Sequence, residues 1–421
     1  MTGITASTLK EQGNAAFRAQ DYHEALRLYT GAMEIEPTNV AYPLNRCMTY
    51  LKLEMWPDAE GDATKALALS PREVKALYRR SIARREQKDF RGAKHDIWAF
   101  SDAGGEWTPL LDQCEKISAS EGESIMNDGF EVKESVGKGL GAFATRIFQR
   151  GDMILAEKPI FTIGSQKRFV IKSTVAGLNE SKREAFMSLS PGAVNRYDDP
   201  VVDRYCTNAF ATETRGVALE SVFLAASRFN HGCMRNARYG WNEGSGQLRI
   251  YALRDIAVGE EIEVSFLGPP ERHRAVRSER RAILEKSWGF VCACTVCMLP
   301  SAEREKSDRR RSEIARMHGG LQSLTGPFQG ERFLQEVMDI IRVMKKEGYI
   351  GEIADLTKEM VARCAVHSDW QSVEYWVRKT YQIIFEEWGA DHRSAKTVLA
   401  PAEWRRNPPA VYHHQTFTTR L

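Results

Sequence analysis

The feature of this sequence that most restricts its fold is a 34-residue period within the first hundred residues. Ala25, Ala59 and Ala93 are each 34 residues apart, and so are Pro37 and Pro71. Segments such as "YHEALRLY" and "FRGAKHDI" place small residues after an aromatic one. Small residues let two helices approach closely, and proline ends a helix. The period therefore predicts stacked pairs of helices.

Helix pairs that repeat at this interval are typical of tetratricopeptide repeats. We predict three such repeats in residues 1–115, and the alternative is a helical bundle without repeats. Stacked repeats form a concave groove lined by the first helix of each pair. Counted within repeats that start at residues 6, 40 and 74, several polar residues fall on one face of these first helices: Lys10, Asn14, Asn45, Lys75 and Arg79.

These five polar residues have the chemistry of a carboxylate-binding groove. Converging cations and amides suit a pair of carboxylates, such as those of an acidic chain terminus. The segments "KEQGN", "YPLNR" and "KALYRR" also resemble the carboxylate-clamp repeats of co-chaperones. That resemblance implies binding of the acidic C-terminal tails of the seventy- and ninety-kilodalton heat-shock chaperones. The alternative is that the basic residues are solvated and the asparagines form caps or turns.

Charge and hydropathy give no sign of a nucleic-acid or membrane protein. The net charge is +3 for 421 residues, which provides no general attraction to nucleic acid or membranes. No apolar run reaches the roughly 18 residues that a spanning helix needs, and the N-terminus lacks a signal-peptide pattern. We therefore expect an intracellular monomer in the cytoplasm, the nucleus or both, whose eight cysteines are thiols or metal ligands.

After residue 126 the sequence changes from helical periodicity to short alternating segments. Residues 116–126 are predicted to be a linker. The stretch "FEVKESVGKGLGAFATRIFQRGDMILAEKPIF" alternates apolar and polar residues around glycine turns, as strands and hairpins do. Strand patterns return in "GQLRIYALRDI" and "EEIEVSF", after a helix-rich insertion expected at about residues 166–227. The middle of the chain is thus predicted to contain many short strands.

A cysteine motif predicts a metal site. The segment "GFVCACTVC" places Cys292, Cys294 and Cys297 in a C-x-C-x2-C pattern. Three thiols within six residues favour a metal over disulfides in a reducing compartment. A closed structural zinc site needs four ligands, and Cys233 in "NHGCMRN" is the candidate for the fourth. The alternative is a cysteine trio without metal.

The cysteines belong to a longer series of motifs. "GKGLGAF", "FNHGCMRNA", "GEEIEVSF" and "WGFVCACTVC" follow one another in that order. This order resembles the SET domain of protein-lysine methyltransferases across residues 127–297, with the cysteine-rich post-SET tail at 288–297. The chain is most similar to the SET-and-MYND group and to fungal-type SET proteins that carry tetratricopeptide repeats. No MYND finger is visible, because residues 160–215 hold only Cys206, so one zinc ion is expected.

The resemblance implies an α+β multidomain architecture. It combines an all-α repeat superhelix with a mostly-β SET fold, whose features are a helical insertion and a post-SET zinc site. Residues 298–421 would form a C-terminal α-helical region, since "FLQEVMDIIRVM" and "VEYWVRKTYQIIF" have helical apolar spacing. Within that region, the basic triplet Arg309–Arg311 is either a nuclear-import signal or, as we favour, a solvated helix face.

The resemblance also implies S-adenosylmethionine as cofactor and a lysine of a histone or non-histone protein as substrate. By motif, the cofactor would contact a glycine turn, an Asn-His pair and an aromatic residue beside the cysteines: Lys138, Gly139, Leu140, Asn230, His231 and Phe290. Asn230 would lie near the amino end of the cofactor, His231 near the adenine and Phe290 on the adenine ring. Taken alone, the turn would simply connect two strands and the Asn-His pair would be structural.

Two aromatic positions depart from the family pattern. Phe266 occupies the position of the usual catalytic tyrosine, and Trp288 that of a second channel tyrosine. Phenylalanine has no polar atom, and the indole N–H donates but cannot accept. Gly232 also replaces a usual serine, and Arg235 a usual proline. The sequence therefore supports two hypotheses: a SET methyltransferase with a chaperone-binding repeat array, or a weakly active or inactive SET-fold adaptor that binds partners through its repeats.

Overall fold

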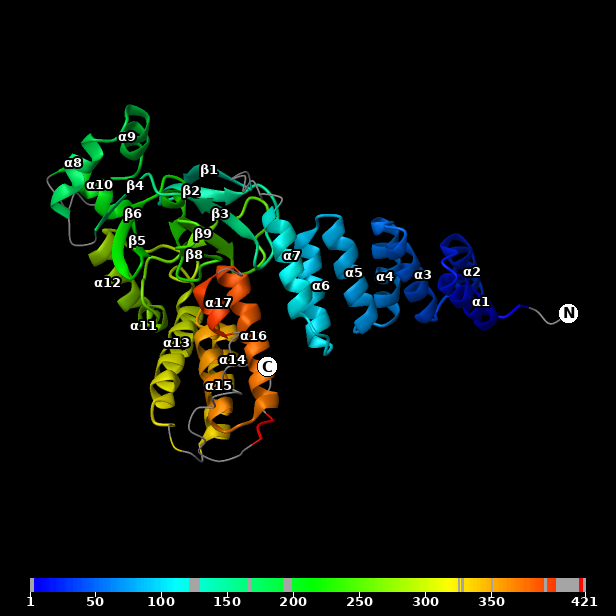
Figure 1. The fold of residues 1–421 in the computed structure, drawn as a ribbon. Helices are drawn as coiled ribbons and strands as arrows, with labels where there is room; N and C mark the ends of the chain where they lie inside the picture. Colours follow the sequence, from blue (N-terminus) through cyan, green and yellow to red (C-terminus); the bar gives the residue numbers. More distant parts are fainter. Residues whose placement is uncertain are drawn as a thin grey trace. The chain divides into compact units, whose positions relative to one another are not determined.

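The computed structural model of this chain describes residues 4–120, 129–164, 168–191, 199–324, 326, 329–349, 351–389, 392–398 and 416–418. The chain forms two compact units, Met1–Ser124 and Ile125–Leu421. The first is helical, and the second combines small β-sheets with further helices (Figure 1). The predicted α+β multidomain class is confirmed. Among the described residues, no helix is both long and apolar enough to cross a membrane.

The first unit is a row of helices in which each helix packs against the next (Figure 1). Ala25, Ala59 and Ala93 are fully buried in it, as the 34-residue period predicts. The helices are α1 (Ala6–Arg18), α2 (Tyr22–Ile35), α3 (Ala41–Lys52), α4 (Trp56–Leu69), α5 (Val74–Glu86), α6 (Phe90–Asp102) and α7 (Thr108–Ser120). Helix α7 covers the start of the predicted linker 116–126, whereas residues 121–126 lie outside the described residues.

A buried ion pair also repeats with the 34-residue period. Arg46 donates to Asp62 at 2.6 and 2.8 Å, joining α3 to α4. Arg80 donates to Asp96 at 2.9 and 2.7 Å, joining α5 to α6. Both carboxylates are almost fully buried, so each guanidinium satisfies a group that would otherwise be costly to bury. The repeated pattern thus includes a buried ion pair as well as the buried alanines.

The second unit begins with short strands in small sheets. Strands β1 (Phe130–Ser135) and β2 (Gly139–Ala144) form a hairpin. Strand β9 (Gln247–Ala252) lies between β3 (Met153–Glu157) and β8 (Ala237–Asn242), and both pairings are antiparallel. Strand β10 (Glu263–Val264) runs parallel to β7 (Asn230–His231), which brings "GEEIEVSF" beside "FNHGCM". Two distant motifs are thereby placed side by side.

The insertion is less helical than expected. Its helices are η1 (Arg168–Val170), α8 (Ile171–Ala176), α9 (Glu180–Met187), α10 (Pro200–Asn208) and η2 (Ala226–Arg228). Residues 209–222, inside the segment predicted as helix-rich, instead form the antiparallel hairpin β5 (Ala209–Thr214) and β6 (Val217–Val222), and β4 (Phe161–Gly164) adds to it. A tight turn at Arg215 and Gly216, both with positive φ, joins the two strands. A two-residue turn of this kind favours a hairpin, so residues 209–222 form two paired strands and not a helix.

Helices make up most of the described part of residues 298–421, as predicted (Figure 1). They are α13 (Ser301–Leu321), α14 (Gly330–Glu347), α15 (Ile353–Val366), α16 (Trp370–Trp388) and α17 (Arg393–Val398). Two further helices, α11 (Pro270–Arg274) and α12 (Arg277–Trp288), precede them within the predicted SET domain. Helix α16 packs on β8 and β9. Its Glu386 also accepts a hydrogen bond from Arg150 Nε, just before β3, at 2.6 Å. The favoured interpretation of Arg309–Arg311 as a solvated face is wrong for Arg311, which is fully buried.

Candidate functional site

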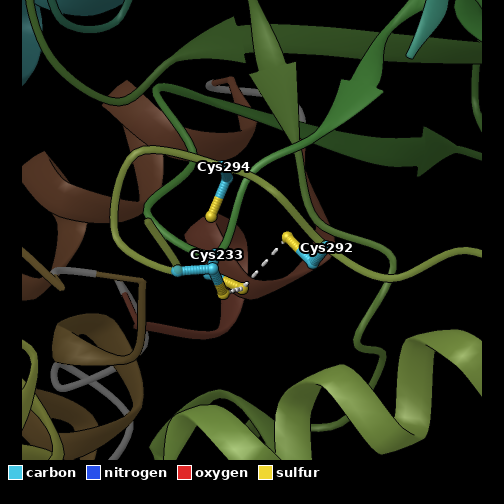
Figure 2. Close-up of side chains that lie close together, drawn as sticks. Cys233, Cys292 and Cys294 are labelled. Atoms are coloured by element: carbon cyan, nitrogen blue, oxygen red, sulfur yellow. Dashed lines mark hydrogen bonds between the residues drawn. The ribbon is translucent and has the colours of Figure 1, made fainter. Parts of the chain in front are cut away.

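The structure brings together the four cysteines that the sequence selected. Cys233, Cys292, Cys294 and Cys297 are all buried, and their sulfur atoms all lie within 4.8 Å of one another. Figure 2 shows the side chains of Cys233, Cys292 and Cys294 pointing toward a common centre. The Cys233 sulfur lies 3.9 Å from that of Cys292 and 3.6 Å from that of Cys297. Tetrahedral zinc with bonds of about 2.3 Å places its sulfur ligands about 3.8 Å apart. The cluster therefore fits a zinc ion.

The electrostatics of the cluster also suit a cation. Hydrogen bonds from the neighbouring thiols hold the pKa of Cys294 well below its usual range. Hydrogen bonds with the same group of sulfurs raise the pKa of Cys292. Buried thiols this close share protons and do not all ionise, because like charges repel. A divalent cation would let all four sulfurs bind as thiolates.

Asn230 connects two of the cofactor motifs. Its amide Nδ2 donates to the carbonyl oxygen of Leu140 at 3.1 Å and to Glu261 Oε1 at 2.8 Å. The predicted cofactor turn and the Asn-His pair, 90 residues apart in sequence, therefore meet here. Gly139 has a φ of +78° and an added Cβ would meet no atom within 4 Å, and Leu140 is half exposed. This edge of β2 is open to a ligand.

Two glutamates beside the turn were missed by the sequence analysis. Lys138 Nζ contacts Glu261 Oε2 at 2.8 Å and Glu263 Oε1 at 2.6 Å. Burial lowers the pKa of Lys138, but its hydrogen bonds to both glutamates outweigh this effect. The pKa is therefore raised overall, and the lysine is held charged. Burial raises the pKa of Glu263. The alternation of "EEIEVS" could have signalled paired carboxylates on one strand face, although their lysine partner is more than 120 residues away.

The departure at Gly232 is related to Glu263. A Cβ atom at position 232 would lie 2.4 Å from Glu263 Oε2. The serine that the family resemblance leads us to expect would therefore force this glutamate to move. Glycine at this position makes room for the carboxylate that binds Lys138.

The His231 ring bonds within the protein. The main-chain N–H of Phe266 donates to His231 Nδ1 at 3.0 Å, and Nε2 lies 3.3 Å from Cys233 Sγ. Since a backbone N–H only donates, Nδ1 accepts and Nε2 carries the proton that faces the sulfur. Burial lowers the pKa of His231 to about 4, so the ring is neutral near pH 7. The predicted contact of His231 with the adenine would therefore have to come from its main chain.

Phe266 and Trp288, the two aromatic residues that differ from the family pattern, lie in contact. The ring centroids of Phe266 and Trp288 are 5.0 Å apart, and those of Phe266 and Phe290 are 6.5 Å apart. Trp288 Nε1 donates to the main-chain oxygen of Phe266 at 3.2 Å. The indole N–H is thus bonded to the protein itself and does not take the place of a channel hydroxyl. Neither ring presents a polar atom to a substrate amine.

The predicted clamp residues lie on α1, α3 and α5, the first helices of the three pairs. Asn14 Oδ1 accepts from Asn45 Nδ2 at 3.1 Å and from the Tyr29 hydroxyl at 2.9 Å. Arg79 Nη1 donates to the Leu44 carbonyl at 2.6 Å, so α5 is fastened to α3. The structure therefore joins the two asparagines directly.

The two clamp lysines keep their side chains toward solvent. Lys75 is exposed, and the Lys10 side chain, 28% exposed, pairs with Glu11 at 2.9 Å. These ammonium groups are therefore accessible to a bound carboxylate.

Comparison with known proteins finds relatives of both parts of the chain. Residues 139–267 match the SET domain family. Histone-lysine N-methyltransferase set5 of Schizosaccharomyces pombe is 28% identical over 286 residues, which cover 66% of this chain and 84% of that protein. Serine/threonine-protein phosphatase 5 of Homo sapiens is 40% identical over 91 residues, 22% of this chain and 18% of that protein.

Solved structures similar to this chain include the first TPR of Spaghetti (RPAP3) bound to the HSP90 peptide SRMEEVD. It is 32% identical and covers 28% of this chain and 93% of that chain, with a TM-score of 0.27. From its 34-residue period and its SET domain match, the chain combines an N-terminal tetratricopeptide-repeat array with a SET domain.

Proposed function

We propose that this chain is a SET-type protein-lysine methyltransferase that uses S-adenosylmethionine and holds one structural zinc ion, with a repeat array that binds acidic C-terminal tails. The observation that carries the proposal is the meeting of four separated motifs at one place. Asn230 binds the Leu140 carbonyl, His231 accepts from Phe266, and the His231 ring also faces Cys233 of the metal cluster. The similarity to a histone-lysine N-methyltransferase supports a lysine amine as the methyl acceptor.

The residues around Asn230 fit the cofactor. S-Adenosylmethionine supplies a methyl group on a positively charged sulfonium. The open edge at Gly139 and Leu140 would lie along its methionine part, and Phe290 would pack on its adenine. Hydrogen bonds from Lys138 and Asn230 lower the pKa of Glu261 despite its burial. This carboxylate, paired with Lys138, lies beside Asn230, where the amino end of the cofactor is expected.

The lysine channel would contribute to catalysis by excluding water and by positioning the substrate amine. A free lysine amine has a pKa of about 10.4 and must lose its proton before it can accept a methyl group. The rings of Phe266 and Trp288 offer apolar walls that disfavour the charged amine by desolvation. Correct placement of the neutral amine can by itself supply several kcal/mol of the barrier.

Cofactor binding is the first test of the proposal. We expect the zinc-loaded native chain to bind S-adenosylmethionine in a calorimetric titration, and Asn230→Ala to weaken binding by about 10-fold or more, because the amide that holds the Leu140 turn and is expected to face the cofactor is lost. Asn179→Ala, which changes an asparagine at the start of α9, is the control and should bind as the native chain does. Absence of heat with the native chain would reject the transferase assignment.

A second candidate function is an adaptor that keeps the SET fold without catalysis. The observation that favours it is that Phe266 has no hydroxyl and that Trp288 bonds its N–H to the Phe266 carbonyl. On this view, partners bind through the repeats and the SET unit serves as a platform. Cofactor binding without methyl transfer to any protein of a cell extract would favour the adaptor.

The repeat groove is expected to bind peptides that end in Glu-Glu-Val-Asp, the chemistry of a chaperone tail. Lys75→Ala combined with Arg79→Ala should weaken binding about 100-fold or more, because two charge-assisted hydrogen bonds are lost. Fluorescence polarisation with a labelled peptide measures this loss. Lys52→Ala, an exposed change at the end of α3, is the matched control.

A peptide with an amidated C-terminus distinguishes the clamp from general charge attraction. It keeps the side-chain carboxylates but loses the terminal one, so a clamp should bind it far more weakly. Equal binding of the amidated and free peptides, or unchanged binding to the double variant, would remove the clamp assignment.

A further inference from the structure

A pocket of about 700 Å³ lies among the helices that follow the cofactor motifs, and none of the residues that line it belongs to those motifs or to the cysteine cluster. Its lining comes from α11, α13, α14 and α15. Helix α13 packs against α11 and α14, and α14 packs against α15, so the pocket lies where these four helices meet (Figure 1). Ligand sites in proteins typically measure about 300 to 1,000 Å³. The pocket therefore has the size of a binding site.

Small residues keep this pocket open. Ala315 and Gly319, one helical turn apart on α13, line it together with Ala362 of α15. All three are exposed. A Cβ atom added at Gly319 would meet no atom within 4 Å. A larger side chain at position 319 would therefore occupy open space at the wall of the pocket without displacing other atoms.

The two arginines that line the pocket already have partners within the protein. Arg274 Nη2 pairs with the buried Glu352 carboxylate at 3.0 Å. Arg363 Nη2 donates to the Leu324 carbonyl at 2.9 Å, and its guanidinium lies 4.7 Å from the centre of the Phe333 ring. Arg274 is thus neutralised by a carboxylate, and Arg363 is held against an aromatic side chain.

His318 adds no positive charge to the pocket. It is half-buried in the lining, and burial, followed by the charge of Arg274, lowers the pKa of its ring. The ring is therefore neutral near pH 7.

Two glutamates of the lining differ from these groups, because they are not paired. Glu271 of α11 and Glu359 of α15 are both exposed, and neither makes a hydrogen bond or an ion pair with another described residue. Burial and the neighbouring Asp355 raise the pKa of Glu359. With Glu352, three carboxylates outnumber the two guanidinium groups at this place. A cation in the pocket would offset the excess of negative charge.

We propose that this pocket is a docking site for a basic segment of a protein partner. Glu271 and Glu359 bind its lysine or arginine side chain, and the small residues of α13 and α15 receive the apolar residue beside it. Unpaired carboxylates around an apolar wall match such a segment in charge and in shape. The proposal does not depend on S-adenosylmethionine, zinc or methyl transfer. It also differs from the clamp in sign, since the repeat groove is expected to bind acidic tails.

Fluorescence polarisation on the full chain tests the proposal with a labelled peptide, Ala-Arg-Leu-Arg-Ala, which is amidated and so offers no carboxylate to the clamp. The native chain should bind this peptide saturably. Glu271→Gln combined with Glu359→Gln should weaken binding about 10-fold or more, because charge-assisted hydrogen bonds are lost. Gly319→Leu should weaken it to a similar extent, because the leucine takes the place of the peptide.

Two control variants match these changes in chemistry and position. Glu313→Gln removes an exposed carboxylate of α13 that does not line the pocket. Gly320→Leu adds the same side chain one residue further along, where a Cβ atom also meets no atom within 4 Å but where the residue does not line the pocket. Both controls should bind the peptide as the native chain does.

A peptide with citrulline in place of both arginines tests the charge of the ligand. It keeps their shape without their charge and should bind at least about 10-fold more weakly. Equal binding of the citrulline and arginine peptides would overturn the proposal, and so would the absence of saturable binding to the native chain. Binding that is unchanged in the double glutamine variant would overturn it as well. Thermal unfolding shows that each variant is folded, and the double glutamine variant, with its two exposed changes, decides alone if Gly319→Leu is not.

Discussion

Phe266→Tyr is expected to raise the rate of methyl transfer about 100- to 1000-fold, the usual effect of one well-placed polar group at a transition state. The physical reason is that the ring is already held in position. The main-chain N–H of Phe266 donates to His231, and its carbonyl accepts from Trp288. A tyrosine would therefore keep the ring in place and add a hydroxyl toward the expected amine. Incorporation of labelled methyl from the cofactor into cell-extract proteins measures the change.

Phe290→Tyr is the matched control for this experiment. It adds a hydroxyl to a neighbouring ring, whose centroid is 6.5 Å from that of Phe266, but at the position expected to pack on adenine. We expect no comparable gain from it. Equal rates for the native chain and Phe266→Tyr would contradict the prediction. Transfer by the tyrosine variant alone would identify the native chain as an adaptor that has lost its catalytic hydroxyl.

Cys294→Ser is expected to remove the zinc ion and destabilise the second unit. The native chain should contain one zinc per chain by elemental analysis. The ion would join Cys233 to a segment that begins 59 residues later, so its loss releases a long-range cross-link. A loss of roughly 4 kcal/mol corresponds to about 6 °C in the melting temperature of a unit of this size. Scanning calorimetry and treatment of the native chain with a chelator measure the same effect.

Cys206→Ser separates loss of the metal from loss of a thiol. Cys206 is a partly buried cysteine outside the four-sulfur cluster, so its replacement should leave one zinc ion bound. A native chain without zinc, or a Cys294→Ser chain with a full equivalent, would exclude the predicted ligand set.

Several features could be predicted because they depend on short-range sequence. The buried alanines and the clamp positions follow from a helical repeat, in which spacing alone fixes the face of each side chain. The trio Cys292, Cys294 and Cys297 is compact enough that its members must lie close together. Cys233 was found only because a single cysteine stood within a recognised motif.

Other features depend on partners far apart in the sequence and were missed or wrong. Arg311 belongs to a basic triplet that is typical of an exposed helix face, but Glu347 and two carbonyl oxygens receive its N–H groups inside the protein. The strands β5 and β6 were included in a helix-rich insertion, although their turn favours a hairpin. Composition within a segment does not specify which residues its helix or hairpin will meet.

The sequence by itself determined the repeat array, the order of the SET motifs and the absence of a hydroxyl at position 266, because each is a local property of residue type and spacing. Only the tertiary structure decided how the remaining polar groups are used. It bonds the Trp288 N–H to the Phe266 carbonyl, binds Lys138 to Glu261 and Glu263, and buries Arg311 against Glu347. These contacts follow from chain segments brought together by packing, where buried polar groups must find partners whatever their distance in sequence.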